Sequence, residues 1–66
     1  MDVLTAIVML GQTYGSHFWF DKTGTIAINK WIWETQDGIC IPYDSLRDAV
    51  FTALDVLQPV SGHVVP

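Results

Sequence analysis

The residue types that most often carry catalysis are few in this chain of 66 residues, and their spacing suits none of the usual reactions. Cys40 is the single cysteine, and His17 and His63 are the two histidines. No CxxC, HxxxH or HExxH spacing of a metal site occurs, and nothing in the spacing brings a histidine to the Cys40 thiol. We therefore expect no metal, no cofactor and no enzymatic activity, with Cys40 as a small apolar residue of a strand.

Charged residues give a different signal, because seven acids stand against three bases and the net charge is −4. Asp44 and Asp48 lie one helical turn apart, where the positive end of a helix dipole explains them without acid–base catalysis. Lys22, Lys30 and Arg47 are the only bases, so little affinity for phosphates comes from counterion release. An acidic surface favours a partner protein with a basic surface.

Aromatic residues are the other group that could carry a function, with three Trp, three Phe and two Tyr in this short chain. Such rings bury large areas, and one small monomer cannot cover all of them. We expect a homodimer, a higher homo-oligomer or a tightly held partner, and the contact surface should include some or all of the tryptophans: Trp19, Trp31 and Trp33. The remaining rings of the predicted sheet are expected in the core: Phe18, Phe20 and Tyr43.

The elements that position these rings begin with a predicted hairpin. Residues 21–24 are a turn sequence between strands at 17–20 and 25–28, and the glycine in the turn can adopt a positive φ. A second turn ends in Asp37-Gly38 and leads into residues 39–43, whose alternation predicts a third strand paired with the second.

In the predicted middle strand, large apolar residues occupy both even and odd positions, so they would point to opposite faces of the sheet. Ile26, Ile28 and Ile32 lie at even positions, whereas Trp31 and Trp33 lie at odd ones. Either both faces of the sheet are covered, or a bulge near residues 29 and 30 shifts the parity and curves the sheet.

A helix between Pro42 and Pro59 is predicted by an apolar stripe with three- and four-residue steps: Leu46, Ala49, Val50, Ala53, Leu54 and Leu57. Asp44 or Ser45 caps it, Ser45 and Asp48 approximate a capping box, and Pro59 ends it. Two apolar residues lie outside the stripe and are expected at a dimer contact: Phe51 and Val56.

The sequence at the two ends of the chain predicts secondary structure less clearly. Residues 3–10 form an apolar run that fits a buried strand or a short helix. Asp2 as a cap and Gly11 as a stop favour the helix, but several β-branched residues favour a strand, which we predict. Residues 59–66 are expected to be a loose tail or to dock across a partner subunit. The expected fold is one α+β domain over residues 1–66, with a curved antiparallel sheet of three to four strands followed by one C-terminal helix.

Residues 17–57 resemble the strand-strand-strand-helix unit of the positive-cofactor transcriptional coactivators and of purine-rich-element-binding (PUR) repeats. The resemblance lies in Phe18-Trp19-Phe20-Asp21, in Gly24-Thr25-Ile26-Ala27-Ile28, and in Gly38-Ile39-Cys40-Ile41-Pro42-Tyr43 leading into the helix. It implies a curved four-stranded sheet before one helix, a dimer, and single-stranded nucleic acid bound on the sheet. The implied stacking residues are Trp19, Trp31 and Trp33, and the implied phosphate contacts are Lys22 and Lys30.

Three functions follow as hypotheses. We favour a small, acidic, non-enzymatic interaction module that binds a partner protein and self-associates, as compact phage or accessory inhibitors do on a host protein's basic surface. The second is a single-stranded nucleic-acid-binding accessory protein of transcription or replication that uses an aromatic sheet face, and the third is a purely structural homo-oligomer. The longest apolar run is too short to span a membrane, and Asp2 directly after Met1 leaves no basic leader, so we expect a cytoplasmic protein.

Overall fold

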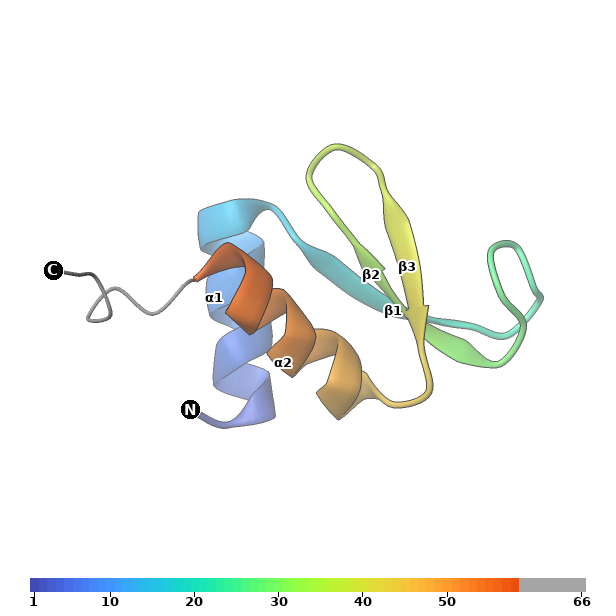
Figure 1. Ribbon diagram of the computed structural model, residues 1–66, viewed down its shortest axis with the longest axis horizontal. Helices are drawn as coiled ribbons and strands as arrows, with labels where there is room; N and C mark the ends of the chain where they lie inside the picture. The colour runs from blue at the N-terminus through green and yellow to red at the C-terminus, as the bar shows by residue number, and fades with distance from the viewer. Residues whose placement is uncertain (59–66) are drawn as a thin grey trace, which may run out of the picture.

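The computed structural model describes residues 1–58, which form two helices and three strands. The order is α1 (Val3–Tyr14), β1 (His17–Asp21), β2 (Lys30–Glu34), β3 (Cys40–Tyr43) and α2 (Leu46–Leu57). Figure 1 shows α2 beside the sheet and next to α1, with the β1–β2 connection at the end of the molecule opposite to α1. The predicted α+β class, the antiparallel sheet and the C-terminal helix are confirmed, and the described sheet has three strands.

Helix α1 replaces the strand predicted at residues 3–10, so that prediction is wrong. The Asp2 carboxylate accepts a hydrogen bond from the Thr5 N–H at 3.0 Å, which caps the first turn. The helix continues through Gly11 and ends at Gly15, whose φ of 69° is left-handed. Each β-branched residue disfavours a helix by only roughly 0.5 kcal/mol, which the burial of one helix face outweighs.

The sheet has the strand order β1-β2-β3 with antiparallel pairs, which confirms the predicted pairing of the third strand with the second. Its register pairs Phe18 with Trp33 and Phe20 with Trp31. Residues paired across antiparallel strands share a face, so these four rings lie on the same side of the sheet. Trp19 alternates with its neighbours and therefore lies on the other side.

The β1–β2 connection is longer than predicted. Strand β1 ends at Asp21 and β2 begins at Lys30, so residues 22–29 form a loop where a four-residue turn and a strand over 25–28 were expected. Asn29 closes the loop with a φ of 60°, and its N–H donates to the Asp21 carbonyl oxygen at 2.6 Å. The two loop isoleucines lie outside β2, whereas Ile32 and Trp33 are neighbours in β2 and are both buried. Both faces of the strand are therefore covered at these two positions, which is the first of the two alternatives.

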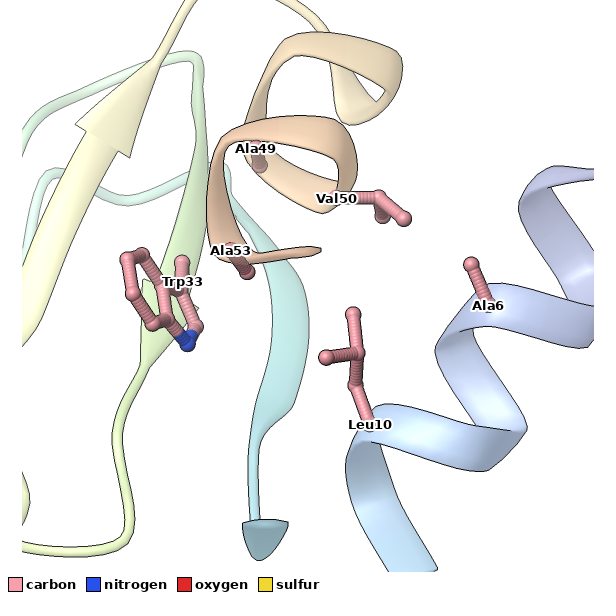
Figure 2. Close-up of a cluster of buried hydrophobic side chains, with 6 residues drawn as sticks. All are labelled: Ala6, Leu10, Trp33, Ala49, Val50 and Ala53. Atoms are coloured by element: carbon pink, nitrogen blue, oxygen red, sulfur yellow. The ribbon is translucent and has the colours of Figure 1, made fainter. Parts of the chain in front are cut away.

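The core lies where α2 meets α1 on one side and β2 on the other (Figure 2). The cluster combines one aromatic ring of β2 with aliphatic side chains of both helices: Trp33, Ala6, Leu10, Ala49, Val50 and Ala53. Alanines at the contact between two helices let their backbones approach closely. The large apolar surface of Trp33 therefore carries much of the burial that joins helix to sheet.

Helix α2 follows its sequence pattern closely. Ser45, one of the two predicted caps, accepts a hydrogen bond from the Asp48 N–H at 3.0 Å. The predicted stripe faces the core, and the helix is followed by Gln58 as its C-cap. Pro59, the tail over residues 59–66 and His63 lie outside the described residues. Neither helix of residues 1–58 is long and apolar enough to cross a membrane.

Candidate functional site

The three tryptophans predicted to share one contact surface do not do so. Trp33 is 3% exposed, and its indole Nε1–H donates to Ser16 Oγ at 3.1 Å, so its assignment to a surface is wrong. Trp19 lies on the opposite face, half-buried, and its Nε1–H donates to Glu34 Oε1 at 3.0 Å. Alternation along antiparallel strands separates these rings, because residues 19 and 33 do not occupy matching positions in the register. Trp31 lies on the helix side of the sheet and is half-buried.

A different group of apolar side chains gathers at the end of the sheet farthest from α1. We call this region the sheet tip and define it as Phe20, Trp31 and the loop 22–29. Phe20 and Trp31 contact edge to face, with ring centroids 5.3 Å apart and an interplanar angle of 62°. Phe20, expected in the core, is 43% exposed, and the loop residues Ile26 and Ile28 are 45% and 62% exposed. The tip therefore presents aromatic and aliphatic surface to solvent.

One buried carboxylate holds the loop of the sheet tip from inside. Asp21 is 1% exposed. Its Oδ1 accepts hydrogen bonds from the N–H groups of Gly24 and Thr25, both at 2.9 Å. Its Oδ2 accepts from Ile26 at 2.6 Å and from Ala27 at 2.7 Å. Four successive backbone donors converge on one anion, as in the backbone nests that bind anions, and here the anion belongs to the chain itself.

The electrostatics of Asp21 follow from these contacts. Burial by itself raises the pKa of the carboxyl, but the hydrogen bonds from the four backbone N–H groups outweigh it and hold the pKa below its usual value. Asp21 is therefore ionised at neutral pH without a cationic partner. Lys30, its neighbour in the register, forms an ion pair with Asp44 instead, and the hydrogen bond and charge of that lysine lower the pKa of the Asp44 carboxyl.

Gly24 is required by the shape of the loop. Its φ of 83° is left-handed, and a Cβ added there would lie 3.2 Å from the Cβ of Ile28. The backbone of the loop is thus fixed by a conformational requirement as well as by the Asp21 carboxylate. Ile26 and Ile28 are consequently presented outward by an ordered loop.

Two of the three bases of the chain lie at the sheet tip or next to it. Lys22 is exposed in the loop and Lys30 begins β2, whereas Arg47 lies in the first turn of α2 with its guanidinium 5.2 Å from the centre of the Phe51 ring. Two acids offset the two lysines: Asp21, at the end of β1, and Asp44, which is paired with Lys30. The tip end is therefore balanced in charge, and the net charge of −4 arises from the rest of the chain.

Cys40 and His17 lie at the other end of the sheet, away from the tip. Burial, followed by the nearby Glu34 charge, raises the pKa of the Cys40 thiol, which is the opposite of what an activated nucleophile requires. His17 is exposed at the beginning of β1. Within residues 1–58, no three His, Cys, Asp or Glu side chains gather as they would around a metal ion.

Comparison of the chain with protein-family models, with curated proteins and with solved structures found no match. The resemblance to the coactivator and PUR-repeat unit stays a prediction. It implied four strands before one helix, whereas the described chain places three strands between two helices.

The sequence reasoning missed the roles of Asp21, Ile26 and Ile28. A signal was present, because an aspartate at the beginning of a turn often accepts hydrogen bonds from backbone N–H groups that follow it. The sequence does not say how many of those groups turn inward, and the alternating isoleucines resemble a strand.

Proposed function

We propose that this protein is a small interaction module that binds a partner protein through the sheet tip. One observation carries the proposal: the loop 22–29 encloses the charged Asp21 carboxylate and has its isoleucines outside. Isoleucines this exposed contribute little to the folding of the isolated chain, but they suit an interface. A loop already fixed by Asp21 loses little conformational entropy on binding, so more of the apolar contact contributes to affinity.

The chemistry of the partner follows from the charge distribution. Phe20, Trp31 and the exposed isoleucines require an apolar depression on the partner, because aromatic and large apolar side chains are typical of interface centres. Because the charges at the tip end balance, they favour neither an acidic nor a basic partner. The net charge of −4 acts over a longer range and increases the rate of encounter with a basic protein. The proposed partner therefore has an apolar depression within a basic surface.

Single-stranded nucleic acid is a second candidate for the same tip. It is favoured by one observation: two of the three bases, Lys22 and Lys30, lie within two residues of Phe20 and Trp31 along the chain. Bases in single strands stack on aromatic rings, and lysines contact phosphates. The protein partner is favoured over it because isoleucines cannot stack on bases and because Lys30 is paired with Asp44.

The experiment compares the immobilised wild-type chain with Ile28→Ser and with the matched control Val56→Ser. The two positions are 62% and 59% exposed, and the control lies on α2. A protein that the immobilised wild-type chain retains is purified, and its affinity for each of the three chains is measured. We expect Ile28→Ser to weaken binding by about tenfold or more and Val56→Ser to leave it unchanged.

Two outcomes contradict the protein-binding proposal. Equal binding of such a partner to wild type and to Ile28→Ser excludes the tip as the contact. Quenching of tryptophan fluorescence by a single-stranded oligonucleotide at low salt, reversed by added salt and lost with Lys22→Ala, favours the second candidate instead.

A further inference from the structure

The outward face of α1 carries an apolar seam that the fold leaves uncovered in residues 1–58. Leu4 is 72% exposed and Val8 is 55% exposed, and Met1, just before the helix, is 66% exposed. Their spacing of three and four residues is that of a seam between paired helices. Within residues 1–58, the residues that line a shallow groove along the same face all belong to α1: Leu4, Thr5, Val8, Met9 and Gln12. The opposite face of α1 contributes to the core and leaves this seam for another contact.

The charge of this face indicates what covers it. Helix α1 has no charged residue from Val3 to Tyr14, although the chain has a net charge of −4. A basic partner protein would therefore meet no acidic side chain on this helix. A second copy of the chain meets no like charge at the seam itself, which makes α1 the surface where two acidic molecules can pack.

We propose that two copies of this chain form a dimer through the outer faces of α1, packed antiparallel about a twofold axis. Leu4 of each copy then lies beside Val8 of the other, and the contact is the same from both sides, as twofold symmetry requires. A parallel arrangement would bring the two Asp2 carboxylates together at one end. The antiparallel arrangement separates them by roughly 12 Å along the helix axis, from a rise of about 1.5 Å per residue.

Helix α2 is a poorer place for this contact than the sequence suggested. Val56 is exposed, but Phe51 is half-buried next to the Arg47 guanidinium. The exposed surface of α2 also carries Asp48 and Asp55, which a twofold contact would bring towards their copies. The dimer contact is therefore assigned to α1 rather than to Phe51 and Val56.

The α1 dimer leaves both sheet tips free, because the tip lies at the end of the molecule opposite to α1 (Figure 1). One helix of 12 residues is about 18 Å long and offers less than the roughly 800 Å² per partner of a standard interface. We therefore expect a dimer that dissociates on dilution in the micromolar range or above. Two tips in one dimer would bind a repeated or dimeric partner with added avidity.

The first test measures the mass of the full chain by sedimentation equilibrium from about 10 µM to about 1 mM. We expect the mass to rise from that of one chain, 7.4 kDa, towards twice that value. Val8→Glu should weaken the association by about tenfold or more. The matched control Val56→Glu adds the same charge at a similarly exposed position, 59% against 55%, and should leave it unchanged. Circular dichroism of both variants confirms that they fold.

Two different results would contradict the α1 dimer. A wild type that is monomeric at every concentration overturns the dimer and leaves the α1 face to residues 59–66 or to another protein. Dissociation by Val56→Glu without dissociation by Val8→Glu overturns the assignment to α1 and restores α2. The mass measurement needs no partner, so these results stand independently of the binding at the tip.

A charge-pair experiment tests the antiparallel geometry. In the double variant Leu4→Lys/Val8→Glu, the antiparallel dimer sets each introduced lysine beside the introduced glutamate of the other chain, so the double variant should associate more tightly than either single variant. In a parallel dimer, lysine faces lysine and glutamate faces glutamate, so the double variant should associate more weakly than either single variant. Sedimentation equilibrium of the three variants measures the difference, and the second result overturns the proposed geometry.

Discussion

The core and the sheet tip place polar and apolar groups in opposite ways. In the core, Trp33 is inside and its one polar atom is satisfied by Ser16. At the tip, the Asp21 carboxylate is inside and isoleucines are outside. The core is thus held by buried apolar area, whereas the tip is held by hydrogen bonds that leave its apolar side chains available for contact. The same substitution should therefore have different effects in the two regions.

Truncation of the core ring should have the largest effect. Trp33→Ala should lower the free energy of unfolding by about 3–5 kcal/mol, because it removes the large side chain that joins α2 to the sheet. A domain this small has little more stability than that, so much of the variant should be unfolded in water. Urea denaturation followed by far-UV circular dichroism measures the change.

Ser16→Ala gives the matched polar comparison in the core. It leaves the Trp33 Nε1–H without its acceptor at a buried position and should cost about 1–3 kcal/mol. If Trp33→Ala cost less than Ser16→Ala, the core would not depend on apolar area, and the proposed contrast with the tip would fail.

Removal of the charge inside the tip should have a smaller and more local effect. Asp21→Asn keeps the size of the side chain but directs an NH₂ group at backbone donors that need an acceptor. Amide hydrogen exchange of residues 24–27 should become faster, while the amides of α2 change little. Asp44→Asn, at an exposed carboxylate outside the loop, is the control. Unchanged exchange in Asp21→Asn would show that the carboxylate does not hold the loop.

Acid should release the same loop. The folded pKa of Asp21 lies below its usual value, so the unfolded state binds more protons as the pH falls. The stabilisation is complete above the unfolded pKa of about 3.9 and is lost as the pH falls through the lower folded value. We expect the protection of residues 24–27 from exchange to be constant from neutral pH to about pH 4 and to decrease below it. Asp21→Asn should lack this decrease.

The sequence predicted the elements whose pattern is strong and local. The apolar stripe of α2, its Ser45 cap and the alternating third strand are confirmed, because each needs only a few neighbouring residues. Helix α1 was missed since apolar residues lie on both of its faces. Leu4 and Val8 hide the period of 3.6 residues, and they are also the residues of the proposed dimer contact.

The sheet tip was missed for a different reason. Asp21 accepts four hydrogen bonds that depend on the conformation of the whole loop, and no spacing in the sequence specifies them. The sides taken by Trp19 and Trp33 depend on the register between β1 and β2, and a hairpin loop of unknown length leaves the register open. Long-range geometry, rather than composition, determines which ring is core and which is surface.

The smallest effect on stability is expected at the outside of the tip, and it is the sharpest comparison with the core. Ile28→Ser should change the free energy of unfolding by no more than about 0.5 kcal/mol, because the side chain is 62% exposed. Ile32→Ser makes the same change at a side chain that is fully buried in β2, and it should be strongly destabilising. Urea denaturation of the two variants, side by side, measures the difference. Equal losses of free energy of unfolding in the two variants would show that Ile28 stabilises the fold as a core residue does. A neutral Ile28→Ser that also loses the partner would assign this side chain to binding rather than to folding.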